Sequence, residues 1–253
     1  MNFYEIPFNE NCQTTMTHLL HNIHLQILSM KAMASRLSVM ALVIGITLLP
    51  GSFSLAVEID PLTVASEIQK AYDKTTTFRA SFTQSSSLSG MRHRERKGSG
   101  TVVIKKPGFM RWDYITPSQQ VLINDGEKFS LYFASENQLI ITSAREYLKE
   151  DLTYAFFTGN GDIHRDFEVK SAPGIMQKKT LHCIKLLPKK QHAQVESLYV
   201  WVDKSTFFIV QLQMHDHLGT VTDLILQDVE VNLSVSDDLF TFTPPEDTEI
   251  IIQ

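Results

Sequence analysis

The hydrophobic positions of the chain first recur with a helical period and then alternate. Ala65, Ile68 and Tyr72 stand at helical spacing, with polar and charged residues between them. An Asp-Pro pair at 60–61 supplies an N-cap residue followed by proline, which is favoured at the first helical position. This pattern predicts a short amphipathic helix over about 61–74.

From Phe78 onward the pattern is typical of strands, which are rich in β-branched and aromatic residues and separated by turn signals. One of the turns, Asn124-Asp125-Gly126, has the sequence of a tight hairpin. A second helix is predicted over about 144–157, ended by the glycines at 159 and 161. Strands are predicted near 78–84, 100–104, 110–114, 121–123, 129–133, 164–171, 180–187, 195–203, 207–215 and 220–231.

Many successive strands with few helices between them predict an α+β fold that is mainly an antiparallel β-sheet, and such a sheet curls. No linker, low-complexity tract or internal repeat interrupts residues 57–253. We therefore expect this range to form a single domain.

An uncharged hydrophobic run, Leu37 to Leu49, precedes the domain and follows two basic residues, at 31 and 36. At about 1.5 Å per residue it covers roughly 20 Å, less than the ~30 Å hydrocarbon core of a bilayer. Small residues at 54 and 56 complete the features of a secretory signal peptide over 30–56, cleaved between Ala56 and Val57. A membrane anchor is the alternative, if weakly polar flanks extend the run.

Residues 1–29 do not suit the start of such a signal, because they contain two acids and no Lys or Arg. We interpret them as an upstream mis-start before Met30. Cleavage after Ala56 would remove Cys12 and leave Cys183 alone, so no internal disulfide is expected. Because no cysteine stands at the new N-terminus to carry a lipid, we expect the exported protein to be free in solution, and we expect a monomer.

The composition excludes several classes of protein. The chain has 253 residues, 43% hydrophobic and 20% charged, with a net charge of −5. These values are ordinary for a globular protein, and they provide no global basic field for nucleic-acid binding.

Catalytic and cofactor motifs are missing from the sequence, which contains no G-x-S-x-G, H-E-x-x-H, Walker loop or C-x-x-C. Asp and His alternate at 162–166 and cluster again at 215–217, which are ligand types for a metal. The second cluster has the pattern of a hairpin turn, and we expect no metal and no cofactor. The basic run 92–97 is interpreted as a solvated hairpin loop, with a docking patch for anionic headgroups or an acidic partner as the alternative.

Two neighbouring strand segments place hydrophobic residues on one face. Val102 and Ile104 share their parity with Lys106, and after a Pro-Gly kink the residues of one face are Met110, Trp112 and Tyr114. An ordinary core would explain this face. A curled sheet with few helices, however, can leave its concave side unfilled, which would create an apolar cavity.

Short motifs follow one another in a fixed order over about 60–250. They are F-x-A-x-F-T-Q at 78–84, G-x-V-x-I-K-K-P-x-F-x-x-W at 100–112, D-G at 125–126, L-P-K at 187–189, D-x-x-G at 216–219 and F-T-F-T-P-P at 240–245. This ordered set resembles the outer-membrane lipoprotein carrier family, LolA. The resemblance implies an unclosed, or half, β-barrel whose concave apolar face is covered by helices acting as a lid.

The resemblance also implies a function and partners. It indicates a non-enzymatic periplasmic chaperone that takes lipoproteins from an inner-membrane ABC transporter to an outer-membrane acceptor. By resemblance, the acyl-chain cavity includes Met110 and Trp112. Further candidates from the same motifs are Phe78, Phe82, Val102 and Ile104.

A lid latch is implied at Lys106 and Tyr72. Many carriers of this family have Arg before the motif proline, where it hydrogen-bonds the lid shut. Lys106 keeps the charge at this position but lacks the planar fork of donors. Tyr72 matches the apolar lid partner and adds a hydroxyl group.

Two other classes of function fit the same chain. One is a periplasmic lipid-binding or sensor module on the same half-barrel. The other is a lipid hydrolase, which lacks a recognisable nucleophile and base in this sequence.

Overall fold

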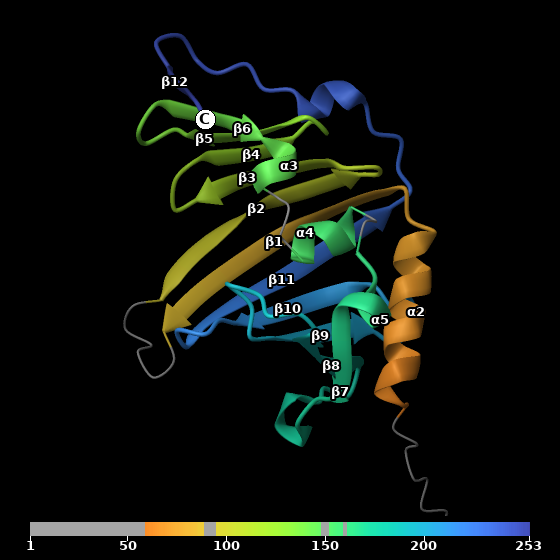
Figure 1. Ribbon diagram of the computed structural model, residues 1–253. Coiled ribbons are helices and arrows are strands. Elements are labelled where there is room, and N and C mark those ends of the chain that lie inside the picture. The colour runs from red at the N-terminus through yellow and green to blue at the C-terminus, as the bar shows by residue number, and fades with distance from the viewer. Residues whose placement is uncertain (1–58, 89–94, 148–151, 159–160) are drawn as a thin grey trace, which may run out of the picture. The chain divides into compact units, whose positions relative to one another are not determined.

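The computed structural model describes residues 59–88, 95–147, 152–158 and 161–253 (Figure 1). Residues 1–29, the predicted signal peptide 30–56 and residues 92–94 of the basic run 92–97 lie outside these ranges. The described residues all belong to one compact unit. Within the described part of the chain, no helix is long and apolar enough to cross a membrane.

Twelve strands form one sheet in the order β12-β6-β5-β4-β3-β2-β1-β11-β10-β9-β8-β7. Neighbours are antiparallel except β12 and β6, which are parallel. The end strands β12 and β7 do not pair with each other, so the barrel is unclosed. The strands are β1 (Thr77–Leu88), β2 (Arg96–Lys105), β3 (Phe109–Thr116), β4 (Gln120–Asn124), β5 (Lys128–Phe133), β6 (Gln138–Ser143), β7 (Phe167–Ser171), β8 (Leu181–Pro188), β9 (Ser197–Asp203), β10 (Ile209–His215), β11 (Thr220–Val231) and β12 (Glu249–Ile252).

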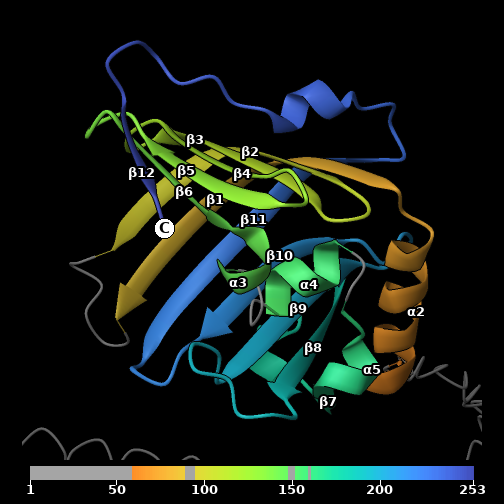
Figure 2. The ribbon, with the colours of Figure 1, turned by 45° about the horizontal axis from the view of Figure 1, so that its top comes forward.

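Short helices lie on one side of this sheet, and the C-terminal segment lies on the other (Figures 1 and 2). Figure 2 shows the sheet bent around the helical side, which is therefore the concave side. The helices are α2 (Pro61–Asp73), α3 (Ala144–Tyr147), α4 (Leu152–Phe157) and α5 (Ile163–Asp166), with 3-10 turns η3 (Gly174–Met176) and η4 (Asp237–Phe240).

Alternation along the strands builds a separate hydrophobic cluster on each side of the sheet. On β2, Val102 belongs to the main cluster of the concave side, whereas Val103 belongs to an outer cluster with Phe240 of the C-terminal segment. Lys105 fastens that segment by donating to the carbonyl oxygen of Val235 at 2.8 Å and to Asp237 at 2.6 Å. The outer face of the β2–β6 half is therefore covered by the C-terminal segment, whereas the helices lie on the concave side.

The first predicted helix is confirmed as α2. It buries Val64, Ala65, Ile68 and Tyr72 on one face. The side chain of Asp60, however, makes no capping hydrogen bond, and its carbonyl oxygen accepts from the backbone N–H of Val64. The helix is thus stabilised at this end by proline geometry and the buried face rather than by a side-chain cap.

The hairpin at 124–126 is also confirmed. The Asp125 carboxylate accepts from the backbone N–H groups of Glu127 and Lys128, and Gly126 has a φ of 96°. A left-handed φ of this kind explains the glycine at this position.

The second predicted helix, over 144–157, is helical in both of its described parts, α3 and α4, with 148–151 outside the described residues. One predicted boundary was wrong. The strand near 164–171 begins only at Phe167, because Asp162 accepts from the backbone N–H of Arg165 at 2.6 Å and so caps the short helix α5. The helix cap at Asp162 therefore outweighs the alternating pattern that predicted a strand from residue 164.

Candidate ligand-binding site

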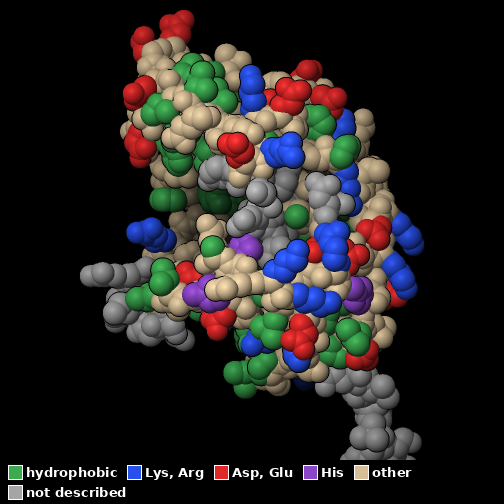
Figure 3. Space-filling model, viewed as in Figure 1, with side chains coloured by type: hydrophobic (Ala, Val, Ile, Leu, Met, Phe, Trp, Pro, Cys, Tyr) green, Lys and Arg blue, Asp and Glu red, His purple; other side chains and the backbone are tan. Residues whose placement is uncertain are grey.

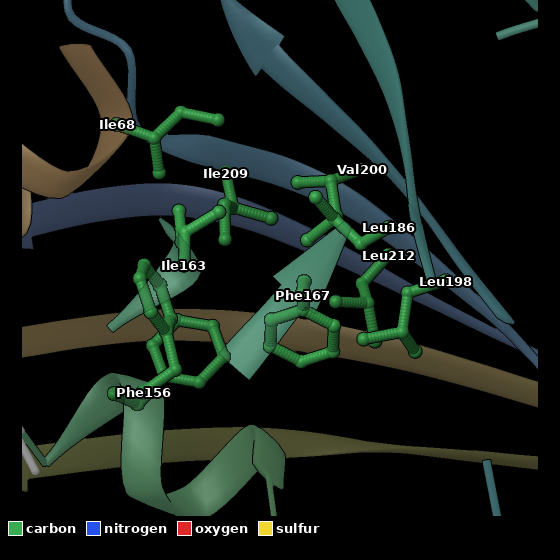
Figure 4. A pocket seen from close by; sticks show the side chains of 10 residues that line it. Ile68, Phe156, Ile163, Phe167, Leu186, Leu198, Val200, Ile209 and Leu212 are labelled. Carbon is green, nitrogen blue, oxygen red and sulfur yellow. The ribbon is translucent and has the colours of Figure 1, made fainter. Parts of the chain in front are cut away.

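The described residues form an apolar pocket between the helices and the β7–β10 half of the sheet (Figure 4). Its lining is entirely hydrophobic and comes from α2, α4, α5 and four strands. The free space, including the part open to solvent, is about 380 Å³. The lining residues are Ile68, Phe156, Phe157, Ile163, Phe167, Leu186, Leu198, Val200, Ile209 and Leu212.

None of the eight residues singled out from the sequence lines this pocket. The six cavity candidates lie instead on the adjoining strands β1–β3, where Phe78, Phe82, Val102, Ile104 and Met110 are buried in the main cluster. Trp112 is partly buried and packs against the same cluster. These six residues lie on the same concave side of the sheet as the pocket, but on its β1–β3 half rather than its β7–β10 half.

Phe157 connects the two halves. Its ring lines the pocket and lies 5.7 Å from the ring of Phe78 and 5.5 Å from that of Tyr72. Because α4 supplies this contact, movement of α4 would alter the pocket and the β1–β3 half together.

The β1–β3 half carries an aromatic group of its own. The ring of Phe82 lies 4.8 Å from the rings of both Trp112 and Tyr114. The hydroxyl of Tyr114 donates to Gln84 Oε1 at 2.8 Å, and burial raises its pKa. Figure 3 shows hydrophobic side chains at the floor of a recess left of its centre, on the face that the helices partly cover.

Tyr72 is fully surrounded by aromatic rings at the C-terminal end of α2. Its neighbours are Phe78, Phe156, Phe157 and Phe208, with ring centroids 4.8–6.2 Å away. Its hydroxyl oxygen accepts from the backbone N–H of Ile209 at 3.2 Å. Burial raises the pKa of this hydroxyl well above its usual value, so it stays neutral. Tyr72 thus joins α2 to strand β10.

Lys106 joins the same end of α2 to the β2–β3 turn. Its ammonium donates to the backbone carbonyl oxygen of Tyr72 at 2.6 Å. Partial burial lowers the pKa of Lys106, an effect that the negative charge of Asp73 opposes. The C-terminal carbonyls of a helix attract cations, so this position suits a lysine.

The helices are also linked to each other by polar contacts. Ser66 Oγ on α2 lies 3.0 Å from His164 Nε2 on α5, and Gln69 Oε1 accepts from the backbone N–H of Ile163 at 3.0 Å. Gly161 packs against the backbone of α4, where an added Cβ would lie 2.7 Å from the nitrogen of Phe156. Helices α2 and α5 are therefore joined by side-chain hydrogen bonds, and α4 by close packing.

In both clusters of potential metal ligands, the side chains form hydrogen bonds or ion pairs with other groups of the protein. Asp162 caps α5, and Asp166 binds Arg165, which lowers the pKa of its carboxyl group. His215 and His217 bond to Gln213 and to a backbone oxygen, and Asp216 accepts from the N–H groups of its own hairpin turn. Within the described ranges, no group of three such residues could hold a metal ion.

A buried free cysteine, Cys183, lies on the outer side of the sheet. Burial raises its pKa to about 12, so it remains protonated and unreactive at physiological pH.

Sequence reasoning missed the pocket-lining residues because it concentrated on strands that carried recognised motifs. A signal was present in the continuous hydrophobic run from Leu198 to Val202 on a predicted strand, which indicates a strand buried on both faces. The packing of Leu198 and Val200 against α4 and α5 could not be predicted from that run.

Among the described residues, the half-barrel thus carries an apolar pocket on the concave side that its helices partly cover. A sequence model described as "Outer membrane lipoprotein carrier protein LolA" matches residues 73–243. The chain belongs to this family of carrier proteins, which are binding proteins rather than enzymes.

Several relatives share this description. An outer-membrane lipoprotein carrier protein of Nitrosomonas europaea is 30% identical over 179 residues, covering 71% of this chain and 84% of the relative. One from Legionella pneumophila is 26% identical over 199 residues, covering 78% and 93%.

Solved structures with a similar arrangement are more distant. A LolA superfamily protein from Nitrosomonas europaea is 13% identical, with a TM-score of 0.41, over 73% of this chain and 98% of that one. An uncharacterized conserved protein from Thermus thermophilus is 10% identical, with a TM-score of 0.49, over 76% and 98%.

Proposed function

We propose that this protein is a periplasmic chaperone that carries the acyl chains of lipoproteins on the concave side of its half-barrel. The observation that carries the proposal is the pocket, because every side chain that lines it is hydrophobic. A polar or charged ligand would find no hydrogen-bonding partner there, whereas a hydrocarbon chain needs none.

The free-energy cost of exposing acyl chains to water explains why such a carrier is needed. Each CH₂ group of an acyl chain that is exposed to water costs about 0.8 kcal/mol, so a lipoprotein does not cross an aqueous compartment unescorted. The pocket is tight, and an acyl chain would need the helices to move aside. The candidates Phe78, Phe82, Val102, Ile104, Met110 and Trp112 would then become the second wall of the cavity.

Lys106 and Tyr72 would act as the latch of this lid. The bond from Lys106 to the end of α2 and the bond from the Tyr72 hydroxyl to β10 both hold α2 against the sheet. Loading would break or loosen these contacts, and closure would favour release of the cargo. This is how a carrier could bind acyl chains and still give them up.

The proposed route follows from family membership and the predicted signal peptide over 30–56. Cleavage after Ala56 would export residues 57–253 as a single domain. The partners would be an inner-membrane lipoprotein-releasing ABC transporter and an outer-membrane lipoprotein acceptor.

Identification of the bound cargo tests this proposal. The protein is purified from the periplasm, and the molecules that accompany it are analysed by mass spectrometry. Proteins with a diacylglyceryl-cysteine at the N-terminus are the expected cargo. Free lipids alone would instead favour a lipid-binding or sensor module, and an empty protein would contradict both.

A further inference from the structure

One edge of the sheet carries an excess of positive charge. Between Glu168 and Glu196 the sequence contains six lysines and no acidic residue, although the whole chain has a net charge of −5. This stretch comprises most of β7, the turn η3 and strand β8. The latch and the apolar pocket do not use these lysines.

Three cations gather around η3. Lys178 Nζ lies 5.2 Å from the centre of the Trp201 ring and donates to Gln211 Oε1 at 2.6 Å. Lys204 Nζ donates to the backbone oxygen of Lys179 at 2.8 Å. Both hydrogen bonds go to neutral oxygens, so they do not neutralise the positive charge.

The charge continues along the outer side of β7 and β8. Lys170 and Lys185 are directly opposite each other across the two strands, an arrangement that disfavours the sheet by itself. Lys185 Nζ lies 5.3 Å from the centre of the Tyr199 ring, and Lys170 pairs with Glu168.

Neighbouring carboxylates have other partners. Asp203 accepts from the hydroxyl of Ser205 and from the backbone N–H groups of Ser205 and Thr206, and these bonds lower its pKa to about 2. Asp223 accepts from the side chains of Gln211 and Gln213. Both carboxylates keep their negative charge, so the positive character of this edge rests on the excess of lysines between Glu168 and Glu196.

An exposed aliphatic side chain lies next to these lysines in the sequence. Ile175 lies in η3 and is 93% exposed, more than any other large hydrophobic residue that the structure describes. An exposed aliphatic side chain close to lysines has the chemistry of a membrane-interface contact, with the apolar group below the headgroups and the cations among them. An acidic protein would match the lysines but would leave Ile175 without an apolar partner.

We propose that Ile175, Lys178, Lys179 and Lys204, here called the η3 surface, dock the protein on anionic phospholipid headgroups. Contacts of this size are weak and reversible, which suits a protein that approaches a membrane and leaves it again. The proposal concerns the lipid surface and does not depend on what the pocket carries.

Cosedimentation of the exported protein with cargo-free vesicles tests the proposal. We expect binding to vesicles of phosphatidylethanolamine and phosphatidylglycerol, weakened by salt, and no binding to vesicles of phosphatidylcholine alone. Lys179→Glu should weaken binding about fivefold or more, since each lysine near an anionic surface contributes about 1 kcal/mol. Ile175→Ser should weaken it about tenfold, because an inserted aliphatic side chain is lost.

Matched variants separate the η3 surface from general charge and hydrophobicity. Lys128→Glu changes an exposed lysine on β5, and Leu218→Ser removes a side chain that is 84% exposed in the β10–β11 turn. Both should bind the anionic vesicles like the parent protein. Equal binding to both kinds of vesicle, no binding to either, or equal losses in the η3 and control variants would overturn the proposal.

Discussion

The ammonium of Lys106 and the backbone carbonyl of Tyr72 form a 2.6 Å hydrogen bond that joins the end of α2 to the β2–β3 turn. Tyr72 uses its side chain for a second attachment, to the backbone N–H of Ile209 on β10. One end of a single helix is thus held to both halves of the sheet. The following predictions concern what depends on these contacts.

Replacing Lys106 by leucine should separate loading from unloading. The variant loses a charged hydrogen bond worth about 1.5 kcal/mol at this partly exposed position and gains apolar surface at the rim. We expect it to accept lipoprotein from the inner-membrane transporter but to pass it poorly to the acceptor. Lys106→Arg, which restores a donor with a wider fork, should transfer at least as well as the parent. Two-step transfer in vitro measures both stages, and parental unloading by Lys106→Leu would show that the latch lies elsewhere.

Tyr72→Phe should lower the free energy of unfolding by about 1–3 kcal/mol at neutral pH. The buried N–H of Ile209 loses the hydroxyl oxygen that accepts its hydrogen bond, and such a loss has this cost.

The same variant should have a different pH dependence. The pKa of Tyr72 is raised in the folded protein, so above pH ~10 the unfolded chain ionises this group while the folded chain does not. The parent therefore loses stability there, by up to about 1.4 kcal/mol per pH unit from this group, and the deficit of Tyr72→Phe shrinks. Tyr114 is present in both proteins and cancels. Urea denaturation at neutral pH and above pH ~10 measures the difference, and a constant deficit would contradict a buried neutral hydroxyl.

Trp112 should report on cargo. In a Trp201→Phe background it is the only tryptophan of the chain, and its ring lies 4.8 Å from that of Phe82 on the concave side. We expect an acylated peptide to change its fluorescence, whereas the unacylated peptide of the same sequence should not. Identical responses to the two peptides would place Trp112 in an ordinary core.

Phe157→Leu should weaken acyl-chain binding more than its effect on stability explains. Phe157 connects the pocket with Phe78 and Tyr72, and the smaller side chain should cost about 1–2 kcal/mol of stability. Phe240→Leu is the matched control, because Phe240 is also buried but lies in the outer cluster. Thermal unfolding and binding of an acylated peptide are measured for both. Equal losses of binding would remove the special role of Phe157.

The sequence predicted the strands well where alternation and turn chemistry agreed. The strand over 220–231 and the hairpin at 124–126 are examples. It failed at β6 and β12, since β6 is an apolar run without alternation, and β12 is a four-residue parallel edge strand far from β6 in sequence. Neither the hydrophobic periodicity of a segment nor its turn residues indicate which distant strand it pairs with.

The candidate site was predictable only in part for the same reason. The parity of Val102, Ile104 and Lys106 follows from the period of two, and the structure places the first two in the main cluster and Lys106 against α2. The β7–β10 half of the cavity depends on how α4 and α5 dock against strands that carry no motif. At Asp162, a single side-chain cap produces the short helix α5 where the alternating sequence pattern predicted a strand.

Photo-crosslinking from α4 tests most directly whether acyl chains occupy the apolar pocket. A photoreactive phenylalanine analogue is placed at Phe156, which lines the pocket, and in a second variant at Phe242, which packs on the outer cluster. Each variant is irradiated with a lipoprotein-derived peptide in acylated or unacylated form. The account predicts a crosslink to the acyl chain from position 156 alone and only with the acylated peptide. Crosslinking from position 242 with equal yield, or none from position 156 despite measured binding, would contradict it.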